Sequence, residues 1–351
     1  MAKDKTQRAP FEIAGASVAP GERLKTDIPI SLLANHTGMT LGVEVIHGRE
    51  PGPVLFVSGA VHGDEIIGVE IIRRLAQSRQ LKKLAGTVLL IPIVNAYGFI
   101  ANSRYLPDRR DLNRCFPGSA TGSLAAQLAH KFMTEIVARA DCGIDLHSGA
   151  VHRSNLPQIR AQIANKKVKA LASAFGAPIV LNANLRDGSL RATAREEDCD
   201  MLLYEAGEAL RFDERAVRIG VKGVFQVMRH LNMLGPLKRE KPEPKPVFSQ
   251  SSHWLRAPAG GIVRCFKRNG DKVREGEKLA IVSDPFGENE QRVLAKRDGV
   301  VVGRLNLPVV NRGDALFHVA EVFDPDKAGA GIEKLGLDIV DDPLFDDSGV
   351  I

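Results

Sequence analysis

The sequence predicts an α/β fold, in which a mixed sheet carries helices on both faces, joined to a smaller all-β domain. Strand and helix candidates alternate from residue 51 to residue 235, and the strand candidates are apolar runs of the kind that a sheet buries on both faces. The pattern changes beyond a linker rich in proline and lysine, residues 236–251. Residues 252–323, which we call the β-domain, hold short strands punctuated by glycine and show no helical period.

Local patterns give the individual elements. Residues 24–32 and 39–47 alternate apolar and polar side chains on either side of an Asn-His-Thr-Gly turn signal. Residues 1–50 are therefore expected to form strands that pack on the α/β domain, residues 51–235. Further strands are expected at 54–60, 87–94, 143–147, 178–181 and 201–205. Helices are expected at 65–80, 121–139, 164–175 and 213–233.

The linker and the C-terminal tail show no regular alternation of apolar and polar residues. The linker is expected to let the β-domain fold apart from the main sheet, around a core of its own. The C-terminal tail, residues 324–351, is acidic near its end and is expected to pack loosely.

Composition and charge exclude several classes of protein. The chain has 351 residues, 44% hydrophobic and 26% charged, which fits a globular protein with two domains. Its net charge of +6 comes from dispersed lysine and arginine, so nucleic-acid binding is not expected. We expect no membrane association, because no apolar stretch approaches a membrane span and the N-terminus has no signal-peptide core. Four scattered cysteines suit a reducing compartment, so we expect a cytoplasmic protein.

The strongest motif is the H-x-x-E of residues 62–65. Residues 54–57 predict a buried parallel strand, which puts His62 and Glu65 on the turn from the carboxyl end of a strand into a helix. Open α/β sheets bind their ligands at this edge, and imidazole nitrogen and carboxylate oxygen are both zinc ligands. The structural alternative is a glutamate that favours a helix N-terminus, beside an ordinary loop histidine.

His147 is the candidate for a third ligand. It ends an apolar strand and is followed by a Ser-Gly break, so it is expected at the same edge of the sheet as His62 and Glu65. A catalytic zinc site has three protein ligands and keeps a fourth position for water, so this set predicts one zinc ion per chain. The alternative is a histidine that only makes structural hydrogen bonds at a strand end.

Two further stretches bring charged side chains to that edge. Asp111 to Arg114 lie in an arginine-rich loop after the 87–94 strand. An arginine fork suits carboxylate recognition, and Asp111 is placed to orient a ligating imidazole. Glu205 ends the strand at 201–205, where it would act as a general base beside a zinc-bound water. The alternatives are a solvated surface for the arginines and a salt-bridged strand end for Glu205.

The β-domain resembles biotinyl/lipoyl-like barrels through residues 257–263, 270–282 and 296–305. Those carrier modules need a modifiable lysine at a hairpin tip. The corresponding tip here, residues 284–289, reads Asp-Pro-Phe-Gly-Glu-Asn and contains no lysine. We therefore expect the β-domain to shape the cleft rather than to carry a swinging arm.

The ordered set HGDE, R-x6-DLNR, DLHSG and YEAGE, within residues 50–235, resembles the succinylglutamate desuccinylase/aspartoacylase family of zinc carboxypeptidase-like enzymes, in a bacterial branch with a lipoyl-like barrel. The resemblance implies a zinc hydrolase domain over residues 51–235. It also implies residue roles: zinc bound by His62, Glu65 and His147, a carbonyl-polarising Arg104, a substrate carboxylate bound by Asn113 and Arg114, an Asp111 that orients His62, and a catalytic carboxylate at Glu205.

Two substrate-binding positions of the family cannot be assigned directly to single residues of this sequence. By its spacing from Glu205, Arg195 matches a family arginine that binds a second anionic group, with Arg186 and Arg191 as alternatives. Aspartoacylases also place a substrate-binding tyrosine in the C-terminal domain, whereas tyrosine occurs in this sequence only at positions 97, 105 and 204. The candidates to replace that tyrosine are His253, Trp254 and His318.

The resemblance implies a zinc-dependent amidohydrolase, a deacylase that cleaves the amide bond of small N-acyl amino acids. Two alternatives stay open at this point: a carboxypeptidase-like peptidase or ester hydrolase with the same zinc site, and a non-catalytic binding or scaffold protein. The expected partner is a small-molecule substrate, and assembly into a homo-oligomer is an open question.

Overall fold

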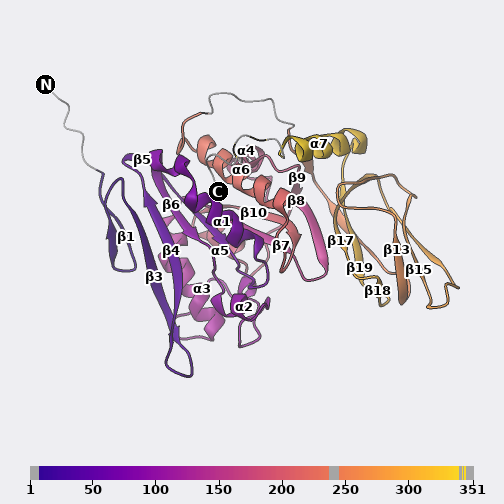
Figure 1. The fold of residues 1–351 in the computed structure, drawn as a ribbon, viewed down its shortest axis with the longest axis horizontal. Helices are drawn as coiled ribbons and strands as arrows, with labels where there is room; N and C mark the ends of the chain where they lie inside the picture. The colour runs from indigo at the N-terminus through magenta and orange to yellow at the C-terminus, as the bar shows by residue number, and fades with distance from the viewer. Residues whose placement is uncertain (1–7, 237–244, 340–341, 343, 345–351) are drawn as a thin grey trace.

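A 13-stranded mixed sheet runs through the molecule (Figure 1). The computed structural model describes residues 8–236, 245–339, 342 and 344. The main path of the sheet has the order β12-β19-β17-β8-β10-β7-β5-β6-β4-β3, while β9, β11 and β14 lie off this path. The strands are β3 (Arg23–Leu32), β4 (Gly38–His47), β5 (Glu50–Gly59), β6 (Ala85–Ile91), β7 (Cys142–Gly149), β8 (Arg153–Ala161), β9 (Ile179–Asn182), β10 (Asp200–Glu208), β11 (Val247–Ser249), β12 (Ser252–Arg256), β14 (Lys272–Val273), β17 (Gly299–Leu305) and β19 (Ala315–Glu321).

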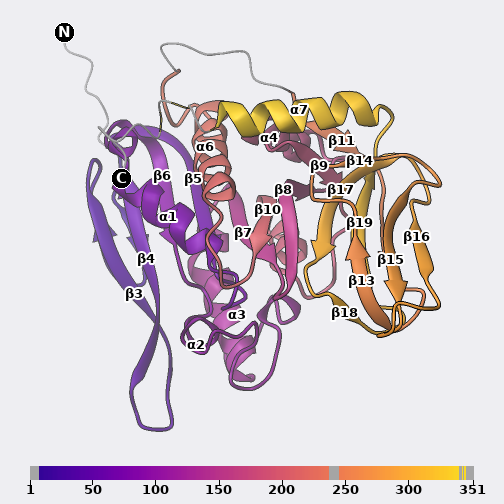
Figure 2. The ribbon, with the colours of Figure 1, turned by 45° about the vertical axis from the view of Figure 1, so that its right-hand side comes forward.

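Helices cover both faces of the α/β part of this sheet (Figure 2). They are α1 (Ile67–Gln77), α2 (Ala96–Ile100), α3 (Leu124–Glu135), α4 (Lys166–Phe175), α5 (Leu190–Glu196), α6 (Glu214–His230) and α7 (Pro325–Asp338), with three short 3-10 helices η1 (Arg79–Lys83), η2 (Leu112–Arg114) and η3 (Val137–Arg139). Residues of α1, α4 and α6 share one core, and residues of α3 and α5 share the core on the opposite face.

The central strands are buried on both faces because their side chains alternate between the two cores. In β5, Leu55 and Val57 belong to the core of α1, α4 and α6, whereas Phe56 packs in the core of α3. Phe56 and Phe132 of α3 meet edge to face with ring centroids 5.7 Å apart. The structure thus confirms the predicted α/β fold with helices on both faces.

The β-domain has two antiparallel layers around a separate core. The first layer is formed by β12, β19 and β17 of the main sheet, together with β14. Phe317 and Val301 lie fully buried in the core between the layers. The second layer is a four-stranded sheet of β16 (Gln291–Leu294), β15 (Lys278–Ser283), β13 (Gly261–Cys265) and β18 (Val309–Val310). A further hairpin, β1 (Phe11–Ile13) with β2 (Ala16–Val18), lies near the N-terminus.

The β-domain is continuous with the α/β domain through the main sheet, whereas the linker predicted a domain that folds apart from it. Residues 153–155 of β8 pair with residues 303–305 of β17, while the other end of β8 pairs with β9, so β8 joins the two domains. A shared core also crosses the boundary: it contains Leu156 and Ile179 from the α/β domain and Val300 from the β-domain.

The C-terminal tail was expected to pack loosely, and this expectation is wrong for its first part. Helix α7 crosses from α6 toward the β-domain (Figure 2) and buries Ala328, Ile332 and Leu335. Arg215 of α6 donates a hydrogen bond to the carbonyl oxygen of Ile332 at 3.1 Å. The rest of the tail lies outside the described residues, apart from positions 342 and 344.

Besides α7 and β11, the sequence-based predictions lack helices α2 and α5 and strand β8. Helices α2 and α5 have only five and seven residues, and β8 contains Pro157 and several polar residues, which hide its strand pattern. Strand β11 lies within the range expected as linker and pairs in parallel with β9, while residues 237–244 lie outside the described residues. No helix in the described ranges has the length and apolarity that crossing a membrane requires.

We expect the chain to unfold in one cooperative transition, because the β8–β17 ladder and the shared core couple the two domains. Trp254, the only tryptophan of the sequence, reports on the β-domain through its fluorescence, whereas far-ultraviolet circular dichroism reports mainly on the helices. The two urea midpoints should coincide. Two clearly separated midpoints would show instead that the β-domain folds independently.

Candidate active site

His62 and Glu65 lie on the loop between β5 and α1. The chain turns at Ala60, whose φ of 50° is in the left-handed region where a non-glycine residue is strained. Gly63 lets the loop approach α2, because a Cβ atom there would lie 2.0 Å from the carbonyl carbon of Gly98. The backbone N–H of Glu65 donates to the carbonyl oxygen of His62 at 3.1 Å, which closes the loop ahead of α1.

His147 reaches the same place from β7, the parallel neighbour of β5. Ser58 of β5 lies beside Asp145 of β7, and Gly59 lies beside Leu146. Because parallel strands end at the same edge of a sheet, the loop after β5 and the end of β7 meet there. The structure therefore brings together the three residues that the sequence predicts as metal ligands.

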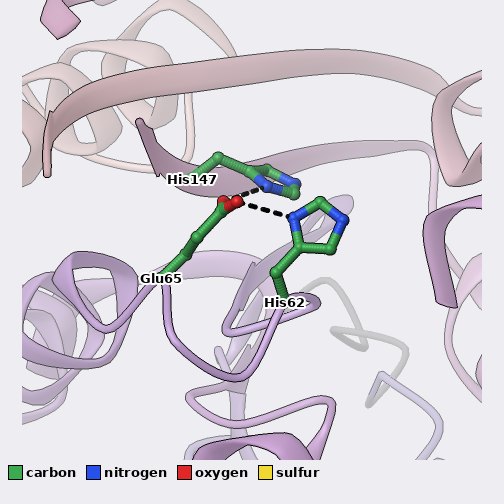
Figure 3. A group of neighbouring side chains, drawn as sticks. All are labelled: His62, Glu65 and His147. Carbon is green, nitrogen blue, oxygen red and sulfur yellow. Dashed lines mark hydrogen bonds and ion pairs between the residues drawn. The ribbon is translucent and has the colours of Figure 1, made fainter. Parts of the chain in front are cut away.

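The three side chains form a compact, buried group (Figure 3). Nδ1 of His62 lies 2.8 Å from Glu65 Oε1, and Nδ1 of His147 lies 2.7 Å from Glu65 Oε2. One ligand atom from each residue lies within 4.8 Å of the others. The exposed fractions of His62, Glu65 and His147 are only 4%, 2% and 3%. The contact of His62 Nδ1 with Glu65 is an ion pair without hydrogen-bond geometry, which leaves this buried nitrogen available as a metal ligand.

Two carboxylates behind the histidines determine which ring nitrogens face Glu65. The Nε2 group of His147 donates to Asp145 Oδ2 at 2.6 Å, and that of His62 donates to Asp111 Oδ1 at 3.0 Å. With the protons on Nε2, both Nδ1 lone pairs point inward. Metal-bound histidines usually have this arrangement, with a carboxylate on the outer nitrogen, so the donor set fits a zinc ion.

Opposite charges keep this buried group ionised. Burial alone would raise the pKa of Glu65, but His62 and His147 outweigh it and hold that pKa well below its ordinary value. Burial alone would lower the pKa of His147, but Asp145 and Glu65 raise it well above its ordinary value. Protons on the histidines thus supply positive charge that a metal ion can replace.

Arg104 lies between two of the carboxylates. Its Nη1 donates to Glu65 Oε1 at 2.9 Å, and its Nη2 donates to Asp111 Oδ2 at 3.0 Å. Asp111 therefore holds both His62 and Arg104, one with each carboxylate oxygen. The resemblance placed Arg104 beside the metal ligands, and it does line the same cavity.

Asn113 and Arg114 belong to η2, which begins after Asp111. The Asp111 side chain accepts from the backbone N–H of Asn113 at 2.9 Å and so caps this short helix. Asn113 Oδ1 in turn accepts from the backbone N–H of Leu190 at 2.9 Å, which orients its amide. Both Asn113 and the exposed Arg114 line the cavity.

Glu205 lies on β10 directly beside His147, its partner in the parallel β7–β10 ladder. Its Oε2 accepts from the side-chain amide of Asn155 at 2.5 Å, and its Oε1 lies 3.4 Å from Nε of Arg160. Glu205 is thus paired with groups of β8 and faces the cavity that contains the metal ligands.

These residues surround one cavity of about 490 Å³, which the β-domain helps to close. Ser252, Trp254 and His318 line it from β12 and β19. The rings of Trp254 and His318 stack with centroids 4.7 Å apart and planes 7° from parallel. His253 is not among the lining residues, and its Nδ1 lies 3.2 Å from an oxygen of Glu321.

Arg195 does not reach the cavity. Its guanidinium pairs with Asp200 Oδ1 at 3.1 Å, and it is not one of the lining residues. The two alternatives, Arg186 and Arg191, both line the cavity. Altogether six arginines face it against three carboxylates, so the cavity is strongly positive; the arginines are Arg104, Arg114, Arg153, Arg160, Arg186 and Arg191.

Sequence reasoning missed four residues of this site. Asp145 could have been predicted from the sequence. It lies two positions before His147, and residues i and i+2 share one face of a strand. Arg153, Asn155 and Arg160 lie on β8, which was not predicted as a strand, and their sequence neighbourhood holds no motif that indicates a site.

Comparisons with known proteins identify the family of the chain. The profile of the succinylglutamate desuccinylase/aspartoacylase catalytic domain matches residues 51–231. A curated relative, the N-alpha-acetyl-L-2,4-diaminobutyric acid deacetylase of Halomonas elongata, is 27% identical over 309 residues, which cover 85% of this chain and 90% of the relative.

Solved structures give the same result. The succinylglutamate desuccinylase/aspartoacylase of Rhodobacter sphaeroides has a TM-score of 0.77 at 26% identity, over 86% of this chain and 96% of that one. The product-bound ectoine utilization protein EutE (DoeB) of Ruegeria pomeroyi has the same TM-score at 23% identity, over 89% of this chain and 99% of that one, and so supports the fold. The chain belongs to the succinylglutamate desuccinylase/aspartoacylase family and is a hydrolase of amide carbon–nitrogen bonds.

Proposed function

We propose that the chain is a zinc-dependent deacylase that hydrolyses small N-acyl amino acids to a carboxylate and a free amino acid. The observation that carries the proposal is the buried group of His62, Glu65 and His147 beside Glu205, in a cavity lined by arginines. The curated deacetylase relative, whose substrate is an N-acetylated amino acid, supports the same reaction class.

One zinc ion per chain would be held by Nδ1 of His62, Nδ1 of His147 and the carboxylate of Glu65. When bound, zinc supplies a Lewis acid and a water whose pKa is lowered to about 7. Asp111 and Asp145 hold the histidines in the tautomer that this binding needs, because each accepts a hydrogen bond from an Nε2–H group.

The remaining steps follow from the side chains around the metal site. Glu205 accepts a proton from the attacking water and gives it to the amide nitrogen as the C–N bond breaks. Arg104 donates to the carbonyl oxygen as it gains negative charge, an interaction typically worth about 3–4 kcal/mol for one donor. Asn113 and Arg114 bind the α-carboxylate of the amino acid.

The charge of the cavity favours a substrate with a second anionic group. Arg153, Arg186 and Arg191 line it, and none of the three forms a salt bridge within the described part of the chain. Burial and the neighbouring Arg160 lower the pKa of Arg191 to about 10, so it is still charged at neutral pH. Arg153 and Arg191 are partly buried and Arg186 is exposed, and a second carboxylate on the substrate would pair with the positive charge that they bring to the cavity.

Metal content tests the ligand set. His62→Ala and His147→Ala should each lose most of the zinc found in the wild-type protein after purification without chelator, because two ligands do not make a closed site. His36→Ala, at an exposed position, is the matched control and should keep its zinc. Full metal retention in both ligand variants would falsify the site.

A substrate screen tests the reaction. The zinc-loaded protein should release amine from a panel of N-acetyl and N-succinyl amino acids and leave peptides without an acyl cap intact, since a peptidase would release a C-terminal residue instead. Glu205→Gln should keep its zinc and lose turnover, because the amide has the shape of the carboxylate but cannot accept the proton. Activity within about tenfold of wild type, a barrier change of only about 1.4 kcal/mol, would remove Glu205 from this role.

Two arginines of α5, four positions apart, separate the candidates for the second anion site. We expect Arg191→Ala to raise KM for N-acyl aspartate and glutamate by about 10-fold or more, given that charge-assisted hydrogen bonds contribute about 1.5–3 kcal/mol each, and to affect N-acyl alanine less. Arg195→Ala should leave both substrate classes unchanged, because its guanidinium pairs with Asp200. If Arg195→Ala instead raised KM for N-acyl aspartate and glutamate more than Arg191→Ala does, Arg195 would be the anion-binding residue.

A further inference from the structure

The carboxylate of Glu205 is held from one side by strand β8. The side-chain amide of Asn155 donates to Oε2 at 2.5 Å, and Asn155 itself is only 8% exposed. Arg160 lies 3.4 Å from Oε1, and its buried Nε has no hydrogen-bond partner. One carboxylate oxygen is therefore fixed by a hydrogen bond, while the other is only attracted by charge.

A shift in the pairing register of β8 and β10 brings Asn155 to Glu205. Glu205 pairs with Gln158, but Gly207 pairs with Asn155, so three residues of β8 span the length of two residues of β10. An extra residue of this kind re-aims the side chains around it. Regular alternation would place Asn155 on the face opposite to Arg160, whereas the irregular ladder lets both reach Glu205.

The β-domain supports Asn155 from its other side. Gly303 of β17 pairs with Asn155, and a Cβ atom at Gly303 would lie 2.7 Å from Asn155 Oδ1. The backbone of Gly303 has no positive φ, so the glycine is needed there for space and not for its conformational freedom. The nearest other side-chain atom, Cβ of His318, would be 3.4 Å away and leaves room for a methyl group.

We propose that Asn155 is a positioning residue for Glu205, and that Gly303 of the β-domain keeps the Asn155 amide in its place. The inference rests on the proposed role of Glu205 as the proton-transferring carboxylate. The terminal torsion of a glutamate is soft, so a donor on one oxygen fixes the plane of the group. The second oxygen is then held toward the cavity, where it accepts and releases the proton.

Two substitutions at Asn155 separate hydrogen bonding from packing. Asn155→Ala should lower kcat by about 10- to 100-fold, the scale of a small misplacement of a catalytic group, with KM within about threefold of wild type. Asn155→Asp has nearly the same shape but replaces the donor by a second carboxylate, so it should be at least as impaired. If Asn155 only filled space, the Asp variant would be close to wild type and the Ala variant worse.

A double-mutant cycle tests the part played by the β-domain. Gly303→Ala should lower kcat because its methyl group displaces the Asn155 amide. In the Asn155→Ala background the same substitution should have little further effect, because nothing is left to displace. Ser154→Ala is the matched control: it lies next to Asn155 on β8, removes side-chain contacts with the loop residues Asn269 and Asn306 of the β-domain, and should leave kcat unchanged.

The outcomes distinguish this inference from the proposed function. Unchanged kcat in both Asn155 variants, in a protein that Glu205→Gln inactivates, overturns the inference alone. So does a Gly303→Ala effect that is equally large in both backgrounds, since the methyl group would then act through another route. Full activity of Glu205→Gln overturns the proposed function, and the inference with it. Thermal midpoints and zinc content of all variants should match wild type, which excludes loss of fold or metal as the cause.

Discussion

The buried carboxylate of Glu65 is the constraint on which the site depends. At 2% exposure it stays ionised because His62, His147 and Arg104 lie against its two oxygens. Two adjacent parallel strands must end together to bring both imidazoles there, and a loop from a third position must supply Asp111. Compensation of this one charge thus relies on the neighbouring positions of β5 and β7, the close turn at Gly63 and the path of the arginine-rich loop.

Much of this arrangement can be predicted from sequence, because its signals are local. The apolar runs of β5 and β7 mark buried parallel strands, and His62, Glu65 and His147 follow them at the edge where such sheets bind ligands. Strand β8 carries no comparable pattern, since Pro157 and its polar neighbours interrupt the alternation. Its contributions to the cavity were missed for this reason. Spacing alone does not separate Arg195 from Arg191, one helical turn away: in the structure Arg195 pairs with Asp200, whereas Arg191 lines the cavity.

The relation between the two domains has no local signal in the sequence. The β-domain has its own core, as its glycine-punctuated strands indicate. Whether its sheet ends at the domain boundary depends on the register of β17 against β8, which joins residues about 150 positions apart in the chain. Helix α7 depends on similar distant contacts, because its apolar residues find partners in both domains only once the sheet is complete.

The continuous ladder from β12 to β3 limits how the enzyme can move. Many enzymes with a cleft between two domains open and close it by a hinge. Such a rotation here would have to break the β8–β17 hydrogen bonds and expose the edges of both strands. We therefore expect the wall formed by Trp254 and His318 to keep its distance from the metal ligands during turnover. Substrate entry and product release would then depend on the loops around Arg114 and Arg186, which line the cavity and can rearrange without breaking strand pairs.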